Sequence, residues 1–177
     1  MTAIYVLESL GRDAESAVEA VAQKLKDDKN GFVRWGAARV LHNVAPLQPQ
    51  KAVHAFAKAL SDDNKTVRRT AVQVLSRYGS QAKEAVKPLG VAVADTEPVI
   101  RGDAIHALQA IGAAANSAQG VVVQALADQK PEVRFAAAQA LAHLGPLDEK
   151  AKKELVKALQ DANSSVRQAA SETFLDN

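Results

Sequence analysis

The chain has 177 residues, enough for one domain with a sizeable core, and 47% of them are hydrophobic, which excludes a disordered chain. Aromatic residues make up only 4% while Ala, Val and Leu are abundant, so an all-helical core of small aliphatic side chains is favoured. The formal net charge of +2 is too low for a domain whose main partner is a nucleic-acid backbone.

Residues 2–11 read TAIYVLESLG, and the same pattern returns at residues 136–145 as AAAQALAHLG. Both stretches have apolar residues at helical spacing and end in glycine. We therefore interpret residues 1–11 as the second helix of an incomplete repeat. The chain is expected to begin inside a longer array.

The following segment, about residues 12–45, is the first full repeat, and its Arg34 begins a series of five arginines. They are spaced 34, 33, 33 and 33 residues apart, each follows Val or Ile, and each has an aspartate six positions before it. The pairs are Val33-Arg34, Val67-Arg68, Ile100-Arg101, Val133-Arg134 and Val166-Arg167. A period of this length, kept over five units, predicts a solenoid of stacked helical repeats.

Each repeat reads as two helices, A and B, with the Val-Arg pair near the start of helix B. The later repeats are expected at about residues 46–79, 80–112, 113–145 and 146–177. The turns between A and B carry good N-cap residues, or prolines at the first helical position, and three B helices are expected to end at glycine. These residues are Asn30, Asn64 and Asn163, then Pro98 and Pro131, and finally Gly79, Gly112 and Gly145.

The motif VxxALADQKPEVRFAAAQALAHLG resembles the short HEAT-like repeats first described in phycobilisome lyases. The resemblance covers essentially the whole chain and includes the EAVKPL stretch at the start of one helix A. It implies a right-handed α-solenoid whose B helices line the concave surface. It does not fix the function, since this repeat occurs in scaffolds, lyase subunits and hydroxylases.

The repeated aspartate and arginine place one acid and one base at each turn between helices A and B. Each arginine is expected to pair within its repeat or with the next repeat along the stack. We interpret the pairs as a structural ladder, because a row of phosphate-binding arginines needs charge that no carboxylate compensates.

Catalytic and metal motifs are missing from the sequence. It contains no cysteine, phosphate-binding loop, nucleophile elbow or His-Glu-x-x-His motif. The four histidines, His42, His54, His106 and His143, fall in different repeats and are interpreted as surface residues. The sequence therefore predicts no enzyme activity, metal or cofactor. It shows no signal peptide or membrane-length apolar run, so the default expectation is a cytoplasmic monomer that does not bind membranes.

A partner is expected on the B helices, at the positions one and five residues after each arginine, which vary while their neighbours repeat. The candidate contacts at these positions are Trp35, Arg39, Arg69, Gln73, His106, Phe135 and Gln139, and Arg77 is added as a neighbour of the first three. Aromatic and arginine side chains dominate protein–protein hot spots. Two alternatives stay open: Trp35 and Phe135 fold into the core, and His106 and Gln139 are solvated surface.

The expected function is therefore that of a protein-binding scaffold with a concave groove. The first 88 residues carry 14 basic and 9 acidic side chains and the remaining 89 carry 8 and 11, so an acidic segment of a partner is expected toward the N-terminal half. An accessory subunit of an enzyme or lyase is the alternative. Nucleic-acid binding is a third reading, which the acidic second half of the chain disfavours.

Overall fold

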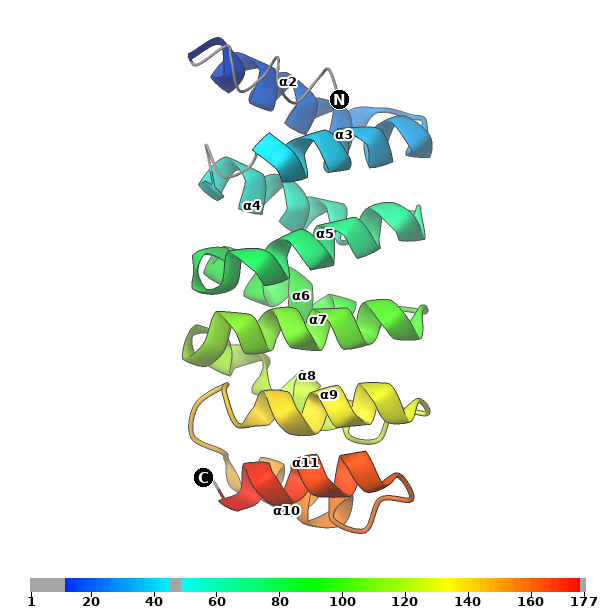
Figure 1. Ribbon diagram of the computed structural model, residues 1–177, viewed down its shortest axis with the longest axis vertical. Helices are drawn as coiled ribbons and strands as arrows, with labels where there is room; N and C mark the ends of the chain where they lie inside the picture. The colour runs from blue at the N-terminus through cyan, green and yellow to red at the C-terminus, as the bar shows by residue number, and fades with distance from the viewer. Residues whose placement is uncertain (1–11, 45–48, 176–177) are drawn as a thin grey trace.

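The computed structural model describes residues 12–44 and 49–175, and its regular elements in these stretches are all helical. The half repeat expected at residues 1–11 lies outside the described residues. Helical hairpins stack in chain order along the long axis of the molecule, from α2 and α3 at one end to α10 and α11 at the other (Figure 1). The all-helical solenoid predicted from the sequence is confirmed.

Two layers of helices run along the stack, with the B helices in front of α4, α6, α8 and α10 in Figure 1. The A helices are α2 (Arg12–Asp27), α4 (Pro49–Ala59), α6 (Val86–Ala92), α8 (Gln119–Ala125) and α10 (Glu149–Ala158). The B helices are α3 (Gly31–Val44), α5 (Lys65–Tyr78), α7 (Pro98–Ile111), α9 (Pro131–Leu141) and α11 (Ser164–Leu175). Two short 3₁₀ helices, η2 (Gly79–Ala85) and η3 (Gly112–Ala118), precede α6 and α8; the sequence pattern did not predict them.

Alanine allows the B helices to approach one another closely. In α9 the side chains of Ala136, Ala137, Ala138 and Ala140 are all at most 1% exposed. Successive B helices contact one another more extensively than successive A helices do, from α5 to α11. The B helices are therefore the more closely packed of the two layers.

The predicted turn residues act as the sequence suggested. The side-chain oxygens of Asn30, Asn64 and Asn163 each accept a hydrogen bond of 2.9 Å from the backbone N–H two residues later. Pro98 and Pro131 stand at the starts of α7 and α9. Each repeat therefore begins its B helix at a defined residue.

Glycine ends two of the B helices where it was expected. Gly79 and Gly112 cap α5 and α7 with φ of 51° and 75°, a backbone region that disfavours residues with a Cβ atom. The third prediction was wrong in part, because α9 ends at Leu141, four residues before Gly145. A contact within the same repeat accompanies the early end: Asn116 of η3 donates to the Leu144 carbonyl at 2.9 Å, so this carbonyl is satisfied outside a helix.

Candidate functional site

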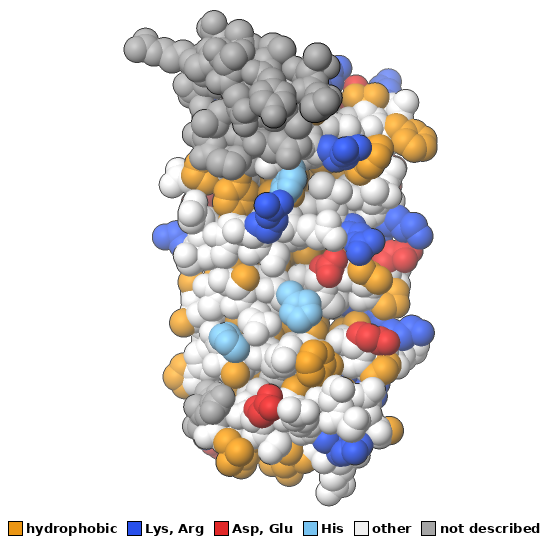
Figure 2. Space-filling model, viewed as in Figure 1, with side chains coloured by type: hydrophobic (Ala, Val, Ile, Leu, Met, Phe, Trp, Pro, Cys, Tyr) orange, Lys and Arg blue, Asp and Glu red, His pale blue; other side chains and the backbone are white. Residues whose placement is uncertain are grey.

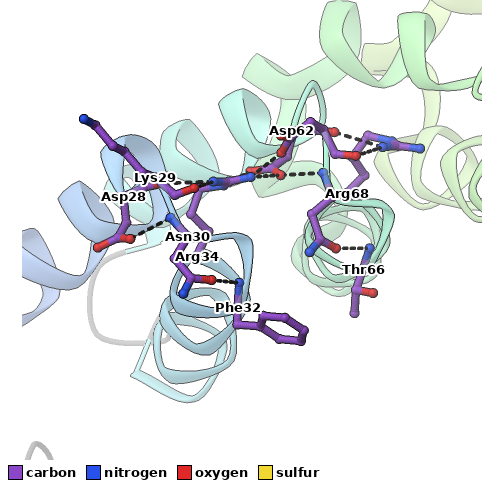
Figure 3. A network of polar contacts seen from close by, with 10 residues as sticks. Asp28, Lys29, Asn30, Phe32, Arg34, Asp62, Thr66 and Arg68 are labelled. Atoms are coloured by element: carbon purple, nitrogen blue, oxygen red, sulfur yellow. Dashed lines mark hydrogen bonds and ion pairs between the residues drawn. The ribbon is translucent and has the colours of Figure 1, made fainter.

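The arginine series forms joints between repeats, and Figure 3 shows the first, between Arg34 and Asp62. Arg101 represents the set: its Nε and Nη2 donate to the two carboxylate oxygens of Asp128 in the next repeat, at 2.7 and 2.8 Å. Its Nη1 donates to the backbone carbonyl of Asp95 in its own repeat at 3.0 Å. Asp128 in turn accepts the backbone N–H of Lys130 at 2.8 Å. One arginine thereby fixes two turns at once.

The same geometry holds along the described stack. The joints are Arg34–Asp62, Arg68–Asp95, Arg101–Asp128 and Arg134–Asp161. Of the two arrangements left open by the sequence, the carboxylate partner is therefore the aspartate of the next repeat. The aspartate of the same repeat contributes its backbone carbonyl.

These joints are poorly accessible to solvent and set the pKa values of their members. The Arg101 and Asp128 side chains are only 15% and 12% exposed. Hydrogen bonds from Arg101 lower the pKa of Asp128 below its ordinary value, against desolvation, which raises it. The carboxylate likewise raises the pKa of Arg101. The arginine charges in the joints are thus compensated, which supports a structural role.

A hollow of about 530 Å³ opens on the B face between α3, α5 and α7. It contains five of the eight residues predicted for partner binding. These are Trp35, Arg39, Gln73, Arg77 and His106. Figure 2 shows basic and histidine side chains on this face. The structure therefore brings together residues that lie up to 71 positions apart in the sequence.

Trp35 and Arg39 form the α3 wall of the hollow. The Arg39 guanidinium carbon lies 5.1 Å from the centre of the Trp35 ring, over its face, in a cation–π contact. Trp35 is partly buried and packs against the core. The two readings of this residue therefore both apply, since one part of the indole contacts the core and another lines the hollow.

Arg77 reaches across from α5 to α3. Its Nη1 lies 2.6 Å from Nε2 of His42, and because a guanidinium only donates, this ring nitrogen is the acceptor. Burial and the nearby Arg77 charge both lower the pKa of His42. The neutral imidazole therefore leaves the positive charge of Arg77 uncompensated by this contact.

Arg69 differs from the other predicted contacts because it has an acidic neighbour. Its Nε lies 3.6 Å from Oδ2 of Asp103, the one acid among the residues that line the hollow. That oxygen is buried and has no hydrogen-bond donor within range. Asp103 and Arg69 thus compensate each other, and in the hollow Arg77 keeps its charge, since its partner is the His42 ring.

Phe135 and Gln139 lie on α9, outside the hollow. Both are half-buried, and Phe135 packs against the core. The structure thus does not bring these two residues to the hollow, and the reading of Phe135 as a core residue describes its packing.

Several residues that line the hollow were missed from the sequence. They are His42, Thr70, Val74, Ser76 and Asp103. His42 was predictable, since Trp35, Arg39 and His42 follow the spacing i, i+4, i+7 that places side chains on one face of a helix. The others depend on how far α5 and α7 rotate about their axes, which one repeat alone does not reveal.

Within residues 12–44 and 49–175, no group of three or more His, Asp or Glu side chains is arranged to hold a metal ion. In the same part of the chain, none of the helices is both long enough and apolar enough to span a membrane.

Comparisons with solved structures show the same architecture. An engineered protein superposes with a TM-score of 0.72 at 22% identity, over 98% of this chain and 85% of that chain. A designed armadillo repeat protein in complex with the peptide (KR)4 gives 0.65 at 22% identity, over 97% of both chains. A computationally designed armadillo repeat protein for modular peptide recognition gives 0.67 at 20% identity, over 98% of this chain and 97% of that one.

No curated protein matches the chain. The assignment to the phycobilisome-lyase type of repeat stays a prediction. The general family is shown, because the model for HEAT repeats matches residues 18–109 and 90–174, nearly the full length. The repeated Val-Arg turns, the stacked hairpins and this match agree, and the chain belongs to the HEAT repeat family.

Proposed function

We propose that the chain is a non-enzymatic scaffold that binds an acidic peptide segment of a partner protein across the B face. The observation that carries this proposal is the hollow, in which Arg39 and Arg77 stand beside Trp35 and the one acid is held by Arg69. A carboxylate placed there meets the Arg77 guanidinium with Trp35 nearby, and arginine and aromatic side chains dominate binding hot spots.

The positive charge in the hollow predicts that its ligand is negatively charged. A solved structure of the same fold is a designed armadillo repeat protein in complex with the peptide (KR)4, which is basic. The hollow described here presents arginines, so the complementary peptide is acidic. Exposed arginines of this kind raise the association rate and make binding sensitive to salt.

Trp35 supplies the measurement, because it is the only tryptophan of the chain and lines the hollow. Its fluorescence is followed while the peptide (ED)4, which has no aromatic residue, is added at low salt. We expect a saturable change that shrinks as salt is raised. The peptide (KR)4 should cause none.

Two variants with the same change of charge locate the site. Arg77→Glu reverses a charge in the hollow, whereas Lys87→Glu reverses one on α6, where Lys87 is exposed in the A layer. The first is expected to weaken (ED)4 binding at least about tenfold and the second by no more than about twofold. Equal losses in both variants, or equally strong binding of a single-stranded oligonucleotide, would contradict the proposal.

A further inference from the structure

Three of the four histidines lie on B helices and one lies in the A layer. His42 is on α3, His106 on α7 and His143 on α9, whereas His54 is on α4. Figure 2 shows pale-blue histidine side chains on the B face beside the basic ones. Histidine is the side chain whose charge ordinarily changes between pH 5 and 8, so this arrangement makes the charge of the proposed groove depend on pH.

His42 is linked directly to the hollow through its bond with Arg77. Burial first, and the Arg77 charge second, lower the pKa of this imidazole. A ligand carboxylate beside Arg77 compensates the second of these causes and attracts the imidazolium form. Because the anion favours the charged ring, binding of the anion and uptake of a proton at His42 strengthen each other.

His106 and His143 are connected across the next repeat boundary by the amide of Gln109. The Nδ1 of His106 lies 3.4 Å from Oε1 of Gln109, and Nε2 of Gln109 lies 3.4 Å from Nδ1 of His143. The Nδ1 of His143 also lies 3.2 Å from the backbone carbonyl of Gln139. Both imidazoles are exposed to a ligand on this face.

The other charges near the row come from four helices. α3 and α5 bring Arg39, Arg69 and Arg77, and α7 brings Asp103, which faces Arg69. α11 packs against α9 and brings Glu172, which accepts a hydrogen bond of 2.9 Å from Gln168 within its own helix. Its other charged side chain, Arg167, donates to the carbonyls of its own turn. The described acids near the row therefore already have donors or counter-charges.

We propose that His42, His106 and His143 form a proton-dependent extension of the acidic-peptide site, running from the hollow across α7 to α9. This proposal rests on the proposed function and names further residues for it. An acidic segment that crosses the B helices meets Arg39 and Arg77 first and then the two exposed imidazoles. The Asp and Glu side chains of the ligand stay ionised at pH 6, since their ordinary pKa values are near 4. Lowering the pH therefore strengthens binding through the protein alone.

The affinity of (ED)4 is measured at pH 6.0 and 7.5 at the same low salt. We expect binding to be about tenfold tighter at pH 6.0, because up to three extra positive charges face the anion. A variant with His42→Gln, His106→Gln and His143→Gln should bind with the same affinity at both pH values. The control variant His54→Gln should keep the full pH dependence. Circular dichroism confirms that each variant is folded.

The outcomes separate the two proposals. Binding that is equal at both pH values overturns the proton-dependent extension but leaves the acidic-peptide site intact. A pH dependence that survives in the triple variant, or that disappears in His54→Gln, also overturns the extension. Absence of (ED)4 binding at both pH values overturns both proposals together.

Discussion

Two neighbouring positions at the start of each B helix differ between repeats in different ways. The arginine position, which we call the invariant edge, is the same in every full repeat, and the next position, which we call the variable edge, holds different residues. At the start of the helix, an arginine and the aspartate of the next repeat meet in the same geometry four times, with Nε–Oδ2 distances of 2.6 to 2.7 Å. One residue further on, facing the hollow side, the corresponding positions hold Trp35, Arg69, Gly102, Phe135 and Gln168. The invariant pair therefore joins the repeats, and the adjacent position varies because it takes no part in the joint.

The largest effect on stability is expected from low pH, because it protonates the aspartates of all four joints at once. Hydrogen bonds from Arg101 and Arg134 lower the pKa values of Asp128 and Asp161. In Asp62 and Asp95 burial is the largest single effect and raises the pKa, but the arginine charge and the arginine and backbone hydrogen bonds together outweigh it, so the pKa is lowered there too. A carboxyl pKa that is lower in the folded state gives stability that is present above the unfolded value near 4 and is lost as the pH falls through the folded value.

We therefore expect the urea midpoint to be nearly constant from pH 7 to 5 and to fall below about pH 4. Urea unfolding followed by circular dichroism at a series of pH values measures this directly. The variant Asp128→Asn should show a shallower fall. An equally steep fall in that variant and in the unchanged chain would mean that other carboxyl groups control acid unfolding.

The next largest effect is the removal of one joint, for which the chain contains its own control. Arg101→Ala leaves the 12% exposed Asp128 carboxylate without its guanidinium partner and is expected to lower the free energy of unfolding by about 3 kcal/mol. Arg167 makes the bonds to the carbonyls of its own turn but contacts no carboxylate among the described residues. Arg167→Ala should therefore cost far less. Equal losses would show that the backbone bonds, and not the joint between repeats, hold the stack together.

Two glycines of α7 provide the next comparison, with smaller expected effects on stability. Gly112 ends α7 with φ of 75° and ψ of −146°, a region nearly restricted to glycine, so Gly112→Ala is expected to cost about 1–3 kcal/mol. Gly102 lies inside α7 on the variable edge, and a Cβ atom there meets nothing within 4 Å. Gly102→Ala should instead stabilise the fold by about 0.5–1 kcal/mol. Thermal unfolding of both variants tests the contrast, and destabilisation by Gly102→Ala would contradict it.

The sequence predicted the features that depend on one repeat and its period. The helix starts at Asn64 and Pro98 and the joints at Arg101 followed from spacing, because each uses a residue type with one clear structural role. The early end of α9 did not follow, since it involves Asn116 of η3, a 3₁₀ helix that the pattern did not predict. In the site, Arg69 was expected as a contact, but its neighbour Asp103 comes from the next helix and compensates its charge. Contacts between different helices decide such cases, and the pattern within one helix does not contain them.

The smallest effect on stability is expected for Arg77, which lies in the last turn of α5 and lines the hollow. Arg68 and Arg77 lie on the same helix, but Arg68 is in a joint and Arg77 bonds to the His42 ring. Because Arg77 is exposed, Arg77→Gln should change the free energy of unfolding by less than about 0.5 kcal/mol. The pKa of His42 should nevertheless rise, since one of the two causes that lower it is the Arg77 charge.

Burial, the larger cause, remains in this variant, so the pKa of His42 should still lie below its ordinary value. NMR titration of the imidazole carbon-bound protons measures the shift, with Lys87→Gln on the A layer as the control for a lost positive charge. If His42 titrates identically in both variants, its pKa does not respond to charge in the hollow, and an anion bound beside Arg77 has no means to recruit a proton there. If only Arg77→Gln raises the pKa of His42, the protonation of His42 is coupled to the charge in the hollow. This coupling is separate from the joints that stabilise the stack.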